Sequence, residues 1–133
     1  MEEVIHVPTT DGFEVIKVRH IIRCESFSNY TKFLLSTGKT MLSTKTLKYY
    51  TNLWHGTSFF RVHRSHLINI SHIIKYHKGK YSTIEMSDKS FVPLSRRGKT
   101  KFVKHFIWSL KTHSYYKYLN QQNILSLSII IIH

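Results

Sequence analysis

The chain has 133 residues, of which 41% are hydrophobic and 14% aromatic, a composition typical of one globular domain rather than of a disordered segment. Its 20 Lys and Arg residues outnumber 7 Asp and Glu residues, and the resulting net charge of +13 favours a polyanionic partner. A single cysteine, Cys24, excludes an internal disulfide, and the sequence shows neither a membrane-spanning apolar stretch nor a secretory signal. We therefore expect a cytoplasmic protein with no membrane partner.

Short strands are expected in the first part of the chain. Val4–Pro8 and Phe13–Val18 alternate in hydropathy around Asp11-Gly12, a turn signal for a β-hairpin. Three further runs are rich in residues that favour strands, namely 21–26, 30–36 and 40–43. The first third of the sequence therefore predicts a series of antiparallel strands joined by short turns.

The hydrophobic period becomes helical over residues 47–54. Ser43 or Thr44 is the expected N-cap of this helix and Gly56 its stop, because these residue types favour the two helix ends. A strand resumes at Phe59–Val62, and Ser65–Asn69 is expected to form a turn or a single helical turn.

Three more strands are expected in the second half, at 73–76, 81–86 and 90–94, the first two joined by a hairpin turn at Lys78-Gly79-Lys80. The aromatic residues in strand-like settings are expected in the core: Phe59, Phe60, Tyr81 and Phe91.

A second helix is expected from Arg96 onward, because an apolar stripe lies opposite a row of lysines. The stripe consists of Phe102, Val103, Phe106 and Leu110. We assign residues 1–113 to one domain and residues 114–133 to a C-terminal tail of unknown role. Within this tail the run Ile129–Ile132 is β-prone and uncharged, which is an aggregation hazard if exposed.

Four arginines beside predicted strand ends are the main candidates for anion contacts. They are Arg61, Arg64, Arg96 and Arg97. Arginine offers paired donors in one plane, which match guanine O6 and N7 or a phosphate, whereas lysine does not bind in this bidentate way. The alternative is a solvated basic face without a ligand. The density of basic residues from 61 to 104 favours nucleic-acid binding.

Metal binding and catalysis are not expected. His63 and His66 have a local spacing that a metal site could use, but no cysteine and few acids lie nearby in the sequence. His63 is expected either to be a packed, hydrogen-bonded residue or to contact a phosphate. Ser65 has no acid to orient a neighbouring histidine, and no glycine-rich phosphate loop is present. We expect no enzyme activity, no metal and no cofactor.

With these residues identified, the chain resembles a LytTR domain, the DNA-binding module of LytR/AgrA-type bacterial response regulators. The most recognisable stretch is Phe60–Asn69, in which His66 stands where an aromatic or apolar residue is common. Further matching blocks are Ile22–Tyr30 and Val92–Arg97, and the resemblance extends roughly from Ile5 to Trp108. It implies a mainly β fold of about ten short strands in small sheets, with one or two short helices.

The resemblance also implies which residues contact DNA. Base or phosphate contacts are expected from Arg64, from Arg97 and from either Thr31 or the adjacent Tyr30. Arg61 and His63 occupy motif positions that either steady the loop or hold phosphate. Phosphate contacts are further expected from a set of basic side chains, namely Lys32, Arg96, Lys99 and Lys101.

The predicted function is that of a sequence-specific transcription regulator that binds duplex DNA by placing basic loops into its grooves. LytTR regulators bind paired direct repeats, so a homodimer on DNA is implied, whereas this chain has no room for a receiver domain. The alternative is a basic RNA-binding or single-strand-binding module without catalytic activity. A histidine-dependent, metal-assisted nuclease is a third, weaker reading.

Overall fold

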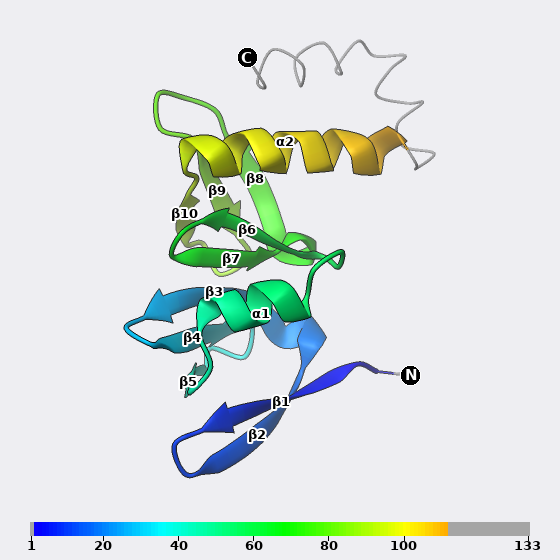
Figure 1. Ribbon diagram of the computed structural model, residues 1–133. Coiled ribbons are helices and arrows are strands. Elements are labelled where there is room, and N and C mark those ends of the chain that lie inside the picture. Colours follow the sequence, from blue (N-terminus) through cyan, green and yellow to red (C-terminus); the bar gives the residue numbers. More distant parts are fainter. Residues whose placement is uncertain (1, 112–133) are drawn as a thin grey trace.

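The computed structural model describes residues 2–111, which form ten strands, two α-helices and two short 3-10 helices. The strands form three small antiparallel sheets, stacked in a column that ends at α2 (Figure 1). The elements are β1 (Val4–Thr9), β2 (Gly12–Lys17), η1 (Val18–His20), β3 (Ile21–Phe27), β4 (Tyr30–Leu35), β5 (Thr40–Ser43), α1 (Leu47–Leu53), β6 (Phe59–His63), β7 (His66–Asn69), η2 (Ile70–His72), β8 (Ile73–His77), β9 (Thr83–Met86), β10 (Phe91–Pro93) and α2 (Arg96–Lys111). This arrangement confirms the predicted fold class.

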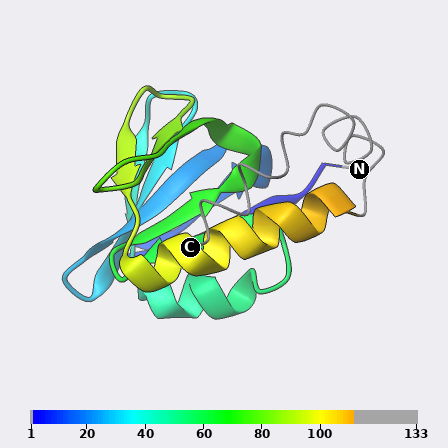
Figure 2. The same ribbon diagram turned by 90° about the horizontal axis from the view of Figure 1, so that it is seen from above.

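The central sheet has the strand order β5-β4-β3-β7-β6 and separates two hydrophobic clusters. The first cluster packs α1 and the β1–β2 hairpin against the sheet through residues such as Phe33, Tyr50 and Trp54. The second cluster packs the β10-β9-β8 sheet and α2 against it through residues such as Met86 and Phe102. Seen from above, both helices lie along the same edge of the stacked sheets, although they belong to different hydrophobic clusters (Figure 2).

The strand β7 corrects the prediction of a turn or helical turn over Ser65–Asn69. Leu67 belongs to the first hydrophobic cluster, whereas the next residue, Ile68, belongs to the second. Because β7 lies between two cores, both of its faces are apolar, and the alternation that marks a half-buried strand is absent. The turn is confined to the two residues Arg64 and Ser65, between the paired residues His63 and His66.

The predicted N-cap of α1 is wrong in detail. The N-cap of α1 is Thr46, whose hydroxyl accepts a hydrogen bond from the Tyr49 N–H at 3.2 Å, rather than Ser43 or Thr44. The Ser43 hydroxyl is instead buried against the Tyr50 hydroxyl, 2.5 Å away.

Tyr81 and Phe91 are not core residues. Tyr81 is 80% exposed because it precedes β9, and Phe91 is 59% exposed because the neighbouring Val92 takes the inward position on β10. Phe59 is buried and Phe60 packs against the second cluster, as predicted.

The second predicted helix is confirmed as α2. The proposed domain boundary at residue 113 and the tail 114–133 lie outside the described residues. Among residues 2–111, no helix is both long enough and apolar enough to cross a membrane.

Candidate nucleic-acid interface

Arg61 holds the tip of the β6–β7 hairpin in place. Its Nε donates to the His63 carbonyl at 2.8 Å, its Nη2 donates to the Arg64 carbonyl, and its Nη1 donates to the Thr51 hydroxyl of α1 at 2.9 Å. The side chain is half-buried, and this burial lowers the pKa of the guanidinium. Arg61 is therefore a positioning residue that supports the turn, since each of its three side-chain nitrogens donates a hydrogen bond within the protein.

His63 and Ser65 complete the support of the turn. The Ser65 N–H donates to His63 Nδ1 at 3.1 Å, and the Ser65 carbonyl accepts from the Ser26 N–H at 2.9 Å. Because Nδ1 acts as an acceptor, the neutral imidazole carries its proton on Nε2 and presents a donor there. His63 is thus hydrogen-bonded within the turn, which is one of the two expected alternatives. In this tautomer the Nε2–H group is a donor that a phosphate can accept.

The N-terminus of α2 is attached directly to β6. The Ser95 N–H donates to the Val62 carbonyl at 3.1 Å, and the Ser95 hydroxyl caps the helix by accepting from the Gly98 N–H at 2.9 Å. A Cβ atom at Gly98 would lie 1.9 Å from the Val62 carbonyl oxygen, so only glycine permits this close approach. The contact fixes the start of α2 relative to the Arg64 turn.

Arg96 and Arg97 occupy the first two positions of α2 and are exposed. Cations are disfavoured at a helix N-terminus by about 0.3–1 kcal/mol each, because the helix dipole is positive there. The two side chains are therefore placed where an anionic ligand would relieve an unfavourable interaction.

An open depression lies between the β6–β7 hairpin and α2. It has a volume of about 450 Å³ and is lined by Thr51, Arg61, Val62, His63, Arg64, Ser95, Arg97, Gly98 and Lys101. Five of the predicted contact residues thus come together in one place from two distant segments of the chain: Arg61, His63, Arg64, Arg97 and Lys101. Among residues 2–111, no acidic side chain lines the depression.

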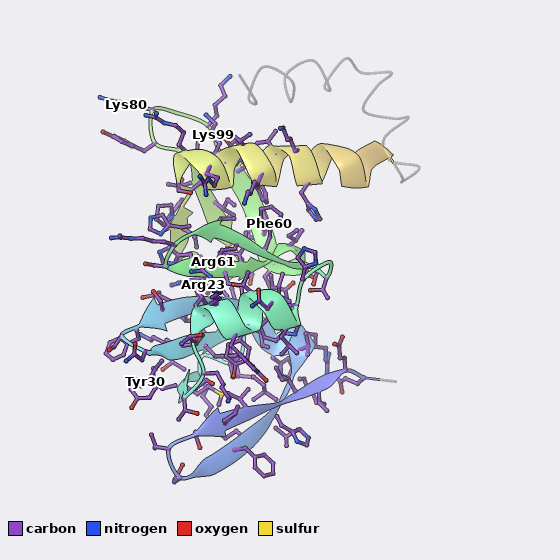
Figure 3. All side chains as sticks on the ribbon, in the orientation of Figure 1. Arg23, Tyr30, Phe60, Arg61, Lys80 and Lys99 are labelled. Carbon is purple, nitrogen blue, oxygen red and sulfur yellow. The ribbon has the colours of Figure 1, made fainter. Side chains whose placement is uncertain are left out.

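Tyr30 lies at the end of the β3–β4 hairpin, and the bond between Ser26 and Ser65 joins this hairpin to the Arg64 turn. Tyr30 is 39% exposed and is drawn at the outer edge of the molecule, whereas Arg61 lies between the β6–β7 hairpin and α1 (Figure 3). Thr31 is fully buried, and its hydroxyl donates to the Lys45 carbonyl at 2.8 Å. Of the two alternatives, only Tyr30 is accessible to a ligand.

The remaining predicted residues lie outside the depression. Lys32 is half-buried on β4, opposite Glu25 of β3. Arg96 is exposed beside Arg97 but does not line the depression. Lys99 and Lys101 are two positions apart on α2, about 200° around the helix axis, so they lie on nearly opposite sides of it.

Lys45 is a basic residue beside β4 that the sequence analysis did not single out. It is exposed, its carbonyl accepts the Thr31 hydroxyl, and its amino group lies 5.3 Å from the centre of the Tyr49 ring. The sequence places Lys45 just before the first helix, but it does not reveal the contact with Thr31 of β4.

The ion pairs of the protein lie away from the depression. Among residues 2–111 they involve the basic side chains Lys17, Arg19, Arg23, Lys39 and His77. In this part of the chain, Arg64, Arg97 and Lys101 form no ion pair, so their charge remains available to a ligand. Residues 2–111 also contain no group of three or more His, Cys, Asp or Glu side chains that could hold a metal ion.

Comparison with known proteins agrees with this geometry. Residues 11–107, most of the chain, match the family described as the LytTr DNA-binding domain, and the chain belongs to this family of DNA-binding domains. A search of curated proteins gave no match.

Among solved structures, the chain is similar to the LytTr DNA-binding domain of a protein from Bacillus cereus described as a methyl-accepting/DNA response regulator. The TM-score is 0.66 and the sequence identity 24%, over 78% of this chain and 96% of that one. At this identity the similarity supports the shared fold.

Proposed function

We propose that the protein is a sequence-specific regulator that binds duplex DNA and reads bases with Arg64 and Arg97. The observation that carries this proposal is the turn at Arg64, where the backbone is fixed and the side chain is exposed. A fixed backbone lowers the entropy lost on binding, and an exposed guanidinium can still reach a base.

The shape of the β6–β7 hairpin fits this role. The major groove of B-DNA admits a two-stranded β-ribbon, and the hairpin ends in a two-residue turn that carries Arg64. A guanidinium bound bidentately to guanine O6 and N7 discriminates against the wrong base by about 1–3 kcal/mol. The second reader, Arg97, is held at a set position because Ser95 and Gly98 attach α2 to β6.

Phosphate contacts are proposed for the other exposed cations around the depression. Lys101 lines it together with Arg64 and Arg97, and Arg96 lies beside Arg97. Lys45 is exposed next to Thr31 of β4, the residue after Tyr30. Tyr30 is proposed to touch the sugar–phosphate backbone from the neighbouring hairpin. Lys32 and Lys99 do not line the depression, and we assign them no base contact.

Duplex DNA fits the surface better than single-stranded nucleic acid. Binding of single strands on a sheet needs an open face with aromatic residues on which bases can stack. Here the central strands β3 and β7 are covered on both faces by the two hydrophobic clusters. The accessible basic groups lie on turns and on a helix end, which suit the grooves of a duplex.

In the cell, we propose that two copies bind paired direct repeats in the cytoplasm and regulate transcription from them. Each copy presents one Arg64 turn and one α2 N-terminus, so each repeat would be read by one protein molecule. Cooperative binding would then depend on the distance between the repeats.

Selection of binding sites from random duplex DNA, followed by competition with single strands and structured RNA, tests this function. We expect one motif that recurs in direct repeats with fixed spacing, and a preference for duplex over both competitors. Recovery of no common motif, or stronger binding to single strands or RNA, would contradict the proposal.

A further inference from the structure

A second surface, unrelated to the basic depression, is an apolar groove between α2 and β8. It has a volume of about 350 Å³ and shares no residue with the depression. Lys75 is the one charged residue in its lining. The other lining residues are Ile70, Ile73, Ile74, Tyr76, Phe102, Val103 and Phe106. Ile74 is 62% exposed and Phe106 45% exposed, which is unfavourable for two large apolar side chains.

The groove runs along a free strand edge. Four consecutive residues, Ile73 to Tyr76, line it. Ile73 and Tyr76 pack against the second hydrophobic cluster, whereas Ile74 is exposed, and a bulge between Ile73 and Lys75 shifts the alternation of β8. A groove that touches all four residues therefore follows the edge of β8 rather than one face. In the described part of the chain β8 is the last strand of its sheet, so the outer N–H and C=O groups of this strand lack a strand partner.

The sequence after α2 has the chemistry to fill this groove. No Asp, Glu, Lys or Arg occurs from Leu119 to His133, and the run Leu125-Ser126-Leu127-Ser128-Ile129 alternates apolar and polar residues. This period of two is that of a strand with one apolar face. The segment is also β-prone enough to be an aggregation hazard if it had no place to pack.

The chain length permits the contact. α2 forms one wall of the groove, and its last lining residue is Phe106. The helix ends at Lys111, which is about 7.5 Å further along the axis at a rise of 1.5 Å per residue. Residues 112–124 can extend to about 40 Å, at roughly 3.3 Å per residue. A segment that leaves the far end of α2 can therefore return along β8 without strain.

We propose that residues 125–131 bind in this groove as an additional strand on the edge of β8. Leu125, Leu127 and Ile129 enter the groove between β8 and α2, and Ser126 and Ser128 face outward. The strand would extend the β10-β9-β8 sheet by main-chain hydrogen bonds, the mode by which extended segments bind to free sheet edges. The chain would thereby cover its own apolar groove and leave the DNA-contacting edge unchanged.

A spin label on a cysteine introduced by Ser128→Cys in the full chain tests the proposal by NMR. The native Cys24 is fully buried, and this burial raises the pKa of its thiol, so the label reacts at position 128. We expect the label to broaden the amide signals of Ile73 to Tyr76 and of Phe102 to Phe106 within the same molecule. Amides of the β1–β2 hairpin should be unaffected.

A mixed sample and two matched variants show whether the groove is filled by the same chain or by a second copy. In a mixture of spin-labelled, isotope-free protein with unlabelled, isotope-enriched protein, broadening of β8 would show that a second copy fills the groove and would overturn the proposal. Leu127→Asp with Ile129→Asp should abolish the intramolecular broadening, whereas Ser126→Asp should preserve it. Absence of broadening at β8 and α2, or equal loss in both variants, would also overturn the proposal.

Discussion

Arg61 and Arg64 lie three residues apart in one motif but have opposite environments. The Arg61 guanidinium is half-buried and donates to two carbonyls of the turn and to Thr51, whereas the Arg64 side chain is exposed. An arginine can hold several acceptors at once because its donors have a fixed planar geometry, which lysine lacks. The first arginine therefore shapes the turn that presents the second.

Replacement of Arg61 by lysine should separate these roles. Arg61→Lys cannot reproduce the contacts with His63, Arg64 and Thr51, so the free energy of unfolding should fall by about 1–3 kcal/mol. DNA affinity should fall as well, although the charge is retained. Urea unfolding measures the first effect and a DNA titration the second.

Arg64→Ala is the matched control for this variant. Because its side chain is exposed, the free energy of unfolding should change by less than about 0.5 kcal/mol. An equally stable Arg61→Lys protein would contradict the positioning role of Arg61.

His66 begins β7, and its side chain is half-buried. Its Nδ1 is buried without a hydrogen-bond partner in the described part of the chain. Burial lowers the pKa of His66, while nearby Glu25 opposes this shift and Arg23 reinforces it. The folded state therefore binds a proton at His66 less readily than the unfolded state does.

The pH dependence of His66→Phe follows from this shift. As the pH falls below about 6.5, His66 is protonated first in the unfolded chain, so it destabilises the native protein in acid. We expect His66→Phe to raise the free energy of unfolding by about 1 kcal/mol at pH 8 and by more at pH 5. Thermal unfolding at the two pH values measures the difference.

His72→Phe is the control for this pH series. Both ring nitrogens of His72 are hydrogen-bonded, to the Ser87 hydroxyl and to the Arg19 carbonyl. The substitution should therefore destabilise the protein. A gain from His66→Phe that is the same at both pH values would show that His66 does not titrate differently in the folded state.

The proposed DNA interface depends on how closely α2 approaches β6. Ala is the better helix former by about 1 kcal/mol, so Gly98→Ala would stabilise α2 if it had room. Its Cβ would instead lie 1.9 Å from the Val62 carbonyl oxygen. We expect a net loss of about 1–3 kcal/mol and weaker DNA binding, because α2 must move away from the Arg64 turn.

Gly79→Ala provides the comparison. The nearest atom to its Cβ, the Tyr81 carbonyl oxygen, is 3.9 Å away, an ordinary contact. This variant should leave both stability and DNA binding nearly unchanged, as judged by thermal unfolding and DNA titration. A stable Gly98→Ala protein with normal DNA affinity would refute the requirement for close contact.

The elements that could be predicted from the sequence are those with one buried face. The β1–β2 hairpin and the helix α2 have clear periods and form as predicted, with Phe102 and Val103 of the predicted stripe buried. β7 was missed because its two buried residues face different cores. The burial of Thr31 depends on the register of β4, which one sequence cannot fix, whereas the helical spacing of Lys99 and Lys101 already places them on opposite sides of α2.

For the molecule as a whole, charge is distributed unevenly along the column of sheets. Four of the seven acidic residues lie within the first fourteen positions. Two of them pair with nearby cations: Glu2 with Lys17 and Arg19, and Glu14 with Lys39. The basic depression lies beyond these pairs, so the acids do not neutralise it. Composition predicted the polyanionic partner, but only the fold shows where the charge is concentrated.

The central proposal for this protein is that Arg64 reads a base from a fixed turn while Lys101 contacts the phosphate backbone. The most direct test measures the affinity of wild-type, Arg64→Ala and Lys101→Ala proteins for a selected site and a scrambled site over a range of salt concentrations. Arg64→Ala should reduce the ratio of the two affinities by about 1–3 kcal/mol. Lys101→Ala should weaken both sites equally and lower the salt slope by about 1. An Arg64→Ala protein that loses the same affinity for both sites would contradict the account.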